Sequence, residues 1–124
     1  MARNAVVNIL KYKNGKLYFS DDDNSWDEIT PDTVTGYPKQ NELMFWMAGP
    51  GVKIITGIDF EDNEDFVNPP KPKYTNRMWI VKVKPDAIIG NEPKYTIRFV
   101  DSDGKCQVVD PKIKIEHGAG SDAD

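Results

Sequence analysis

One acidic stretch near the N-terminus has the residue types and spacing of a calcium-binding loop. Asp21, Asp23, Ser25 and Asp27 stand at alternate positions, where oxygen ligands recur in calcium loops. Trp26, however, occupies the position at which an EF-hand requires glycine for its sharp turn, and no helical pattern flanks the stretch. We therefore expect no EF-hand. A looser calcium site at Asp21, Asp23 and Asp27 and an acidic loop that only keeps the chain soluble are the two alternatives.

The residues that usually carry catalysis or bind transition metals are scarce. His117 is the only histidine and lies near the C-terminus, and Cys106 is the only cysteine. Met44 and Met47 are three residues apart in a strand-like run, so they point to opposite faces and cannot chelate one ion. We expect Cys106 to be a small structural residue on the strand face of Val108. The sequence thus predicts no enzyme, no copper or zinc site and no cofactor.

Loop aromatics suggest a second kind of chemistry. Trp26 lies in the acidic loop and Tyr37 lies in a turn region rich in Gly and Pro. Flat aromatic rings stack on apolar surfaces, which include the faces of sugars. Trp26 and Tyr37 could therefore form a carbohydrate-binding platform, ordered by calcium at Asp21 and Asp23.

Length and composition set the class of protein. The chain has 124 residues, of which 39% are hydrophobic, and a net charge of −4. We expect one domain over residues 1–117 and a flexible polar tail over residues 118–124. No apolar run approaches the ~20 residues of a membrane-spanning helix, and the acidic balance argues against nucleic acid as a partner. The single cysteine and the lack of a visible signal peptide predict a cytoplasmic protein, although a secreted protein whose signal has been removed would look the same.

Charge is distributed unevenly along the chain. Residues 1–70 carry six Lys or Arg and twelve Asp or Glu, whereas residues 71–117 carry ten and six. Such a dipolar surface suits head-to-tail association of copies or binding to an acidic partner, although solvated strands also carry charge. The basic sheet face that this hypothesis requires consists of Lys82, Lys84, Arg98, Lys112 and Lys114.

The pattern of apolar residues predicts strands throughout. Residues 94–100 and 112–116 alternate apolar and polar side chains, as a strand with one buried face does. Asp103-Gly104 and Asn14-Gly15 are hairpin turn signals. Short strands separated by Gly and Pro turns predict an all-β fold, a single antiparallel β-sandwich of seven to eight strands. The expected core consists of Trp46, Ile54, Ile58, Trp79, Val81, Tyr95, Ile97, Phe99, Ile113 and Ile115.

The order of these runs resembles a known family. The segment Ile29-Thr-Pro-Asp-Thr-Val34 precedes a Trp-bearing strand, and the chain closes with Val-Asp-Pro-Lys-Ile-Lys-Ile. This order resembles the cupredoxin-like β-sandwich, especially its copper-less members, with an immunoglobulin-like sandwich as the alternative. The copper-binding members need two His and one Cys, and here only His117 follows the last strand, so the resemblance implies neither copper nor electron transfer.

The sequence favours a non-catalytic domain that binds or assembles through its loops or a sheet edge. The expected partner is a protein, which includes a second copy of the chain. In that assembly Trp26 would be the apolar anchor, because exposed ion pairs contribute only about 0–1 kcal/mol each. The carbohydrate-binding module is the alternative.

Overall fold

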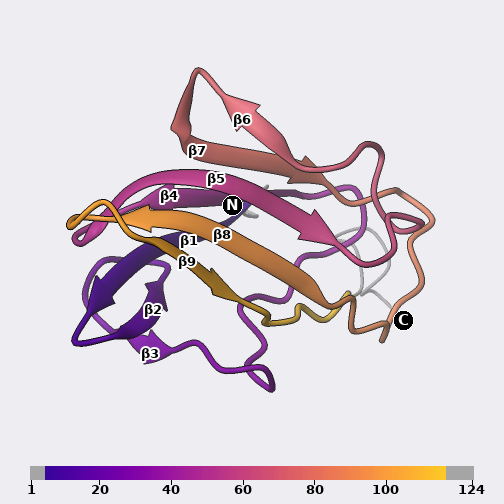
Figure 1. Ribbon diagram of the computed structural model, residues 1–124. Coiled ribbons are helices and arrows are strands. Elements are labelled where there is room, and N and C mark those ends of the chain that lie inside the picture. Colours follow the sequence, from indigo (N-terminus) through magenta and orange to yellow (C-terminus); the bar gives the residue numbers. More distant parts are fainter. Residues whose placement is uncertain (1–4, 117–124) are drawn as a thin grey trace.

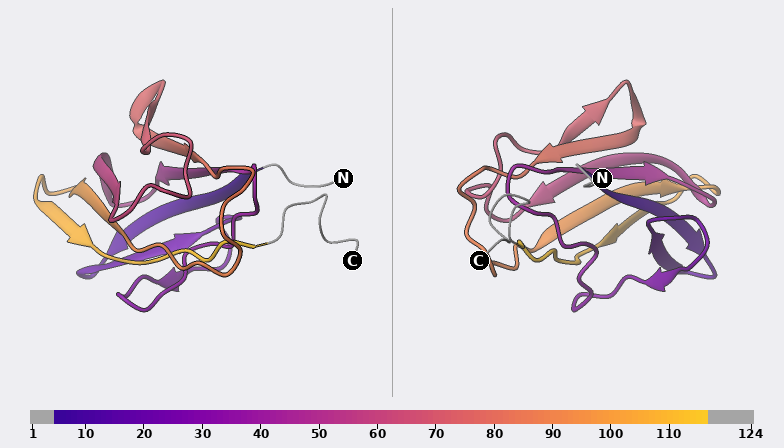
Figure 2. Two further views of the ribbon diagram at one scale, coloured as in Figure 1. Left: turned by 90° about the vertical axis from the view of Figure 1, so that its right-hand side faces the viewer. Right: turned by 180° about the vertical axis from the view of Figure 1, so that it is seen from behind.

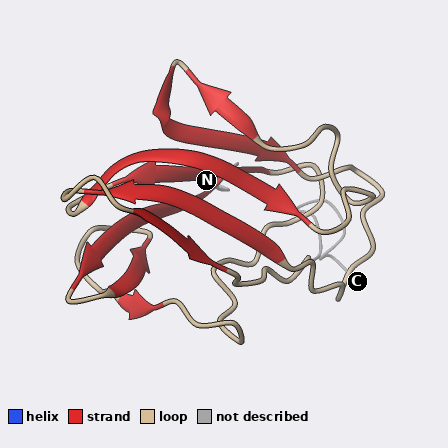
Figure 3. Cartoon of the chain, viewed as in Figure 1, coloured by secondary structure: helices blue, strands red, loops and turns tan. Residues whose placement is uncertain are grey.

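The computed structural model describes residues 5–116, and within that range the chain is all-β with no helix (Figures 1 and 3). The fold class expected from the alternation is confirmed. There are nine strands rather than seven or eight, because two short ones, β3 and β6, had no recognisable pattern. The strands are β1 (Ala5–Lys13), β2 (Lys16–Ser20), β3 (Asp27–Glu28), β4 (Leu43–Ala48), β5 (Val52–Phe60), β6 (Lys71–Lys73), β7 (Thr75–Lys82), β8 (Tyr95–Asp101) and β9 (Cys106–Val109).

The strands form two sheets, of which the larger is not wholly antiparallel. Its order is β3-β2-β1-β4-β7-β6, and the smaller sheet has the order β5-β8-β9. β1 and β4 run parallel, with Asn8 opposite Trp46. Every other pairing between the named strands is antiparallel. The parallel pair was not expected, because strand direction depends on how the chain crosses between sheets and leaves no periodic trace in the sequence.

The two sheets enclose one apolar core, as in a β-sandwich. Leu10, Met44 and Trp46 come from the larger sheet, and Ile58 and Phe99 come from the smaller one; all five side chains are buried. Of the predicted core, eight residues are buried as expected, whereas Trp79 is half-buried and packs against the core's edge. The eight are Trp46, Ile58, Val81, Tyr95, Ile97, Phe99, Ile113 and Ile115.

Ile54 is also only half-buried, and the fully buried residue is its neighbour Ile55. The pairing of β5 with β8 shifts register between Val52 and Ile54 and again between Ile55 and Gly57. A β-bulge adds a residue to one strand, which moves the following side chains to the opposite face. Strict alternation therefore assigned the wrong face to Ile54.

The C-terminal segment continues β9 as an extended chain between two neighbours. On one side the Tyr95 N–H donates to the Pro111 carbonyl and the Ile113 N–H donates to the Pro93 carbonyl. On the other side residues 33–38 run parallel to it, with bridges at Val34–Lys112 and Lys39–Glu116. The predicted final strand is thus present as isolated bridges, and it closes the core through Ile113 and Ile115.

The expectation for Cys106 is wrong, and the expectations for His117 and the tail concern residues that the structure does not describe. Cys106 and Val108 share a face, but that face is exposed, so Cys106 is not a buried structural residue. It stands at the start of the edge strand β9, where no second layer covers it. His117 and the predicted tail 118–124 lie outside the described residues.

Candidate functional site

A pocket of about 550 Å³ lies beside the first half of β1 and is named here the β1 pocket. Ala5–Asn8 form one wall and the extended segment Val34–Tyr37 forms another, while Phe19, Ser20 and the loop that follows β2 complete the lining. The volume falls in the range typical of ligand sites. The two main walls approach closely at Gly36, where an added Cβ would lie 2.9 Å from the Val6 side chain. The glycine therefore sets the distance between them.

The β1 wall of the pocket is an open strand edge. β2 pairs with β1 only from Ile9 onward, because the chain turns away after Ser20. The Tyr12 N–H donates to the Pro50 carbonyl and the Leu10 carbonyl accepts the Gly49 N–H, both in the β4–β5 turn. Since backbone groups alternate between the two edges of a strand, those of Ala5 and Val7 face the opposite edge. In the part of the chain that the structure describes, no strand pairs with them there.

Asn8 is the unusual residue of this wall. Its side chain is 1% exposed, it lines the pocket, and its Nδ2 amide has no hydrogen-bond partner among the described residues. Leaving a buried donor unpaired costs about 1–3 kcal/mol. Native proteins leave few such groups unpaired. An apolar residue at position 8 would continue the inward face of β1, so the amide marks the pocket as more than a packing defect.

The opposite wall is fixed by a buried chain of hydrogen bonds. The Trp46 indole N–H donates to the Tyr95 hydroxyl at 3.1 Å, and that hydroxyl is bonded to the hydroxyl of Thr35. Thr35 also lines the pocket and donates to the Lys112 carbonyl. Burial raises the pKa of Tyr95 to about 12, against the lowering effect of its bonds to Thr35 and Trp46. The phenol is therefore neutral and holds Thr35 in place.

The rim of the pocket is mainly acidic. Asp27 is exposed, whereas Glu42 is buried and its Oε1 accepts the Lys39 N–H at 2.8 Å. Asp21 also lines the pocket and makes an interaction within the protein. Lys39 is the cation among the lining residues. The pocket therefore favours a neutral or basic ligand over an acidic one.

The loop between β2 and β3 is organised by Asp22. Its Oδ1 accepts the N–H groups of Asn24 and Ser25 and the hydroxyl of Ser20. These bonds hold the pKa of the Asp22 carboxyl below its usual value. Among residues 5–116, no three His, Cys, Asp or Glu side chains converge on a point that would suit a metal ion. The calcium hypothesis at Asp21, Asp23 and Asp27 thus gains no support from the geometry.

The two predicted platform residues make different contacts. Tyr37 lines the β1 pocket with 55% of its surface exposed. Trp26 is not among the lining residues, and its ring instead carries the Lys11 ammonium 4.4 Å from its centroid. The same ammonium lies 5.7 Å from the Tyr18 ring. This cation–π contact ties Trp26 to Lys11 of β1, whereas Ser25 and Asp27 on either side of it line the pocket with Tyr37.

The predicted basic residues do not form one sheet face. Lys82 belongs to β7 in the larger sheet, with Lys84 just after it, whereas Arg98 belongs to β8 in the smaller sheet. Arg98 lies 3.7 Å from Asp59, and the Lys112 ammonium lies 2.8 Å from Glu92. The Glu92 contact raises the pKa of Lys112. Lys114 lies in the same extended segment as Lys112, beside residues 33–38.

Comparison with known proteins adds no information about the site. No protein-family model and no curated protein matches the chain. Within the described residues, no helix is long and apolar enough to cross a membrane.

Asn8 and Thr35 were missed in the sequence. A signal for Asn8 exists, because it interrupts the apolar run Ala5-Val-Val-Asn-Ile-Leu10 at an inward position. Thr35 has no such signal, since a threonine in a turn-rich segment is ordinary. Its role arises from Tyr95, which is 60 residues away in the chain.

Proposed function

We propose that this protein is a non-catalytic binding domain whose site is the β1 pocket and whose ligand is an extended peptide segment of another protein. The observation that carries the proposal is the buried Asn8 amide, which has no partner within residues 5–116, in a pocket walled by the open edge of β1. An extended peptide laid along Ala5–Asn8 would bond to the backbone groups of Ala5 and Val7. This is β-strand addition, in which main-chain bonds provide affinity and side-chain pockets provide specificity.

The lining defines the peptide's chemistry. Phe19, Val34 and Tyr37 offer apolar contact, and Asp27 with Glu42 favours a basic residue over an acidic one. Asn8 supplies a donor that suits a peptide carbonyl. We therefore infer a segment that alternates apolar with basic residues. The kinship with copper-less cupredoxin-like domains and the absence of catalysis stay predictions of the sequence.

The test uses two model peptides and amide-resolved NMR. The probe is acetyl-Lys-Val-Lys-Val-Lys-amide, and its control carries an N-methyl group on every residue, which removes the donors of both edges. Binding should shift the amide resonances of Ala5 and Val7 and slow the hydrogen exchange of Val7 for the probe but not for the control. Unchanged Ala5 and Val7 amides at millimolar probe would refute strand addition, and an equal response to both peptides would show binding without backbone pairing.

Asn8→Leu provides a second test with two readouts. Leucine has the same branched shape and the same number of heavy atoms, and it continues the apolar face of β1, so the variant should be more stable by about 1 kcal/mol or more. The same variant should bind the probe at least tenfold more weakly, a difference of about 1.4 kcal/mol. A destabilised Asn8→Leu protein would mean that the amide is satisfied in solution and has no role reserved for a ligand.

A further inference from the structure

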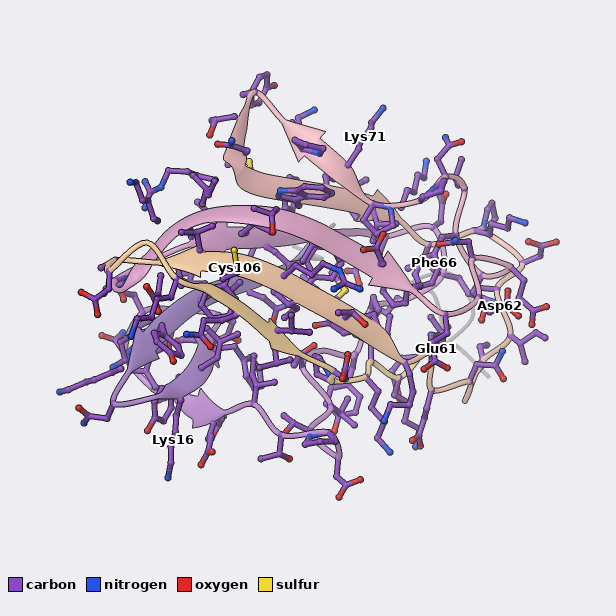
Figure 4. The ribbon with its side chains drawn as sticks, viewed as in Figure 1. Lys16, Glu61, Asp62, Phe66, Lys71 and Cys106 are labelled. Atoms are coloured by element: carbon purple, nitrogen blue, oxygen red, sulfur yellow. The ribbon has the colours of Figure 1, made fainter. Side chains whose placement is uncertain are left out.

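The edges of the two sheets are protected unequally. Natural β-proteins blunt their edges with short strands, charges, proline or bulges, because an open edge pairs with other chains. β3, at one end of the larger sheet, has only two residues, both exposed and acidic. β6, at the other end, reads Lys71-Pro72-Lys73, and the hairpin of β6 and β7 stands above the rest of the molecule (Figures 1 and 2). Lys71 projects into solvent there (Figure 4). Both ends of the larger sheet are therefore blocked.

β5, at one edge of the smaller sheet, is protected by two other devices. The pairing of β5 with β8 carries register shifts. In addition, the carbonyl groups of β5 accept hydrogen bonds from side chains of β7. The Arg77 Nε donates to the Lys53 carbonyl at 3.1 Å, and the Trp79 indole N–H donates to the Ile55 carbonyl at 3.1 Å. A strand arriving at this edge would have to displace both side chains.

β9, at the other edge of the smaller sheet, has no proline, no charge and no bulge along its four residues. The Lys105 carbonyl bonds back to Asp101 of β8, whereas the Lys112 N–H and carbonyl bond outward to residues 33–35. Backbone groups alternate between the two edges, so those of Cys106 and Val108 face the same outward side as those of Lys112. Residues 33–38 cover this edge only from Lys112 onward. Within residues 5–116, no partner bonds to the backbone of Cys106 or Val108.

The side chains of β9 also favour pairing with another strand. The strand reads Cys-Gln-Val-Val and has no charge, no proline and no bulge. Val108 is 53% exposed and Cys106 is exposed beside it (Figure 4). An uncharged edge with exposed apolar side chains is the kind that adds a strand.

We propose that the open β9 edge pairs antiparallel with the β9 edge of a second copy, which joins the two smaller sheets across a two-fold axis. The outward groups fix the register: Cys106 of each copy pairs with Val108 of the other, and Gln107 lies on the axis opposite its own counterpart. Four backbone hydrogen bonds then form. The ends are complementary in charge, because Lys105 of each copy lies beside the region of Asp110 in the other. A second copy fits this edge because the outward N–H and C=O groups of the strand match those of its own copy, and the charges at its two ends are opposite.

The contact is isologous and closes at the dimer, so it does not propagate into filaments. A pair of four-residue strands is small beside a standard interface, so dissociation constants of about 10 µM to 1 mM are expected. This site is separate from the β1 pocket and does not depend on the peptide proposal.

The primary test is sedimentation equilibrium of the full chain over a wide range of concentrations. The wild type should shift from monomer to dimer. Val108→Pro removes an outward N–H that has no acceptor among the described residues and should weaken the dimer at least about tenfold, because two hydrogen bonds are lost by symmetry. Val108→Thr keeps the N–H and should change the dissociation constant much less. A wild type that stays monomeric at about 1 mM, or equal weakening by both variants, would overturn the proposal.

A cysteine trap tests the register independently of affinity. Directly opposed residues of a non-hydrogen-bonded pair have Cα atoms about 4.5 Å apart, which a disulfide can span. In a Cys106→Ser background, Gln107→Cys should form a disulfide-linked dimer on mild oxidation, whereas Ser102→Cys in the adjacent turn should not. Equal cross-linking of the two would reveal random collision, and faster cross-linking at residue 102 would reveal a different contact.

Discussion

The indole N–H of Trp46 and the hydroxyl of Tyr95 are joined by a 3.1 Å hydrogen bond in the centre of the core. The two residues come from different sheets, and their ring centroids lie 5.5 Å apart. The bond therefore ties the two layers together with a defined geometry. Thr35 extends the connection from the core to the wall of the β1 pocket.

Tyr95 should make the protein sensitive to alkali. Its folded-state pKa is raised to about 12 by burial, whereas an unfolded tyrosine titrates near 10. Because the folded value is the higher one, the stability is fully present below pH 10 and is lost as the pH rises toward 12. The loss amounts to about 2–3 kcal/mol, at 1.36 kcal/mol per pKa unit.

Denaturant unfolding between pH 8 and pH 12 measures this loss. Tyr95→Phe lacks the titrating group and should show a shallower decline, although it starts less stable because Trp46 and Thr35 lose their partner. Parallel curves for the wild type and Tyr95→Phe would mean that other groups cause the alkaline unfolding.

Asp101 should contribute to acid sensitivity in the opposite sense. Its carboxylate accepts the backbone N–H groups of Asp103 and Lys105 and the Gln107 amide. The bond to Lys105 is the largest of the effects that hold the pKa of this carboxyl below its ordinary value. The stability is then present above the unfolded pKa, near 3.8, and is lost as the pH falls through the folded value. Asp101→Asn should be less stable than the wild type at pH 7, and thermal melts should show the gap narrowing below pH 4. A gap independent of pH would contradict this assignment.

Gly51 and Gly104 offer a matched pair of substitutions. Both have positive φ, at 82° and 83°. A Cβ at Gly51 would lie 2.0 Å from the Tyr12 carbonyl oxygen, whereas one at Gly104 would meet nothing within 4 Å. Gly104→Ala should cost about 1–2 kcal/mol from backbone strain alone. Gly51→Ala should cost at least about 2 kcal/mol more, because backbone must move. Urea unfolding of both variants checks the difference, and equal costs would show that Tyr12 yields freely.

Trp46 and Trp79 stand directly opposite each other on β4 and β7, yet only Trp46 is fully buried. Trp46→Ala should lower the free energy of unfolding by about 3–5 kcal/mol, because it leaves a cavity and removes the bond to Tyr95. Trp79→Ala should cost less, roughly 1–3 kcal/mol, since its site is partly open to water. Denaturant unfolding that reverses this order would place the centre of the core nearer β7.

Much of the fold was predictable from local pattern. The run Leu43–Ala48, the turn at Asn14-Gly15 and the buried Ile113 and Ile115 follow from side-chain periodicity and from which residues accept positive φ. These properties depend on a few adjacent residues, so they are written in the sequence. The features that were predicted wrongly depend instead on residues far apart in the chain. The bulges that bury Ile55 instead of Ile54 arise from pairing with a distant strand.

The candidate site was largely invisible in the sequence. Tyr37 was recognised as a loop aromatic that could bind a ligand, but the residues that define the β1 pocket meet only after the chain has crossed between the sheets. The open edge of β1 exists because β2 stops pairing at Ser20, and the open edge of β9 exists because residues 33–38 begin to cover it only at Lys112.

Local sequence was enough to predict that this chain forms strands, which residues face inward on most of them, and where two of the tight turns lie, because each of these depends on neighbours in the chain. How the distant segments meet settles which edges are paired and which are left open, and among residues 5–116 the Asn8 amide has no partner beside one of the open edges. The physical reason is that every residue type except proline carries the same backbone donor and acceptor. Which of them remain unpaired is therefore settled by how distant segments meet.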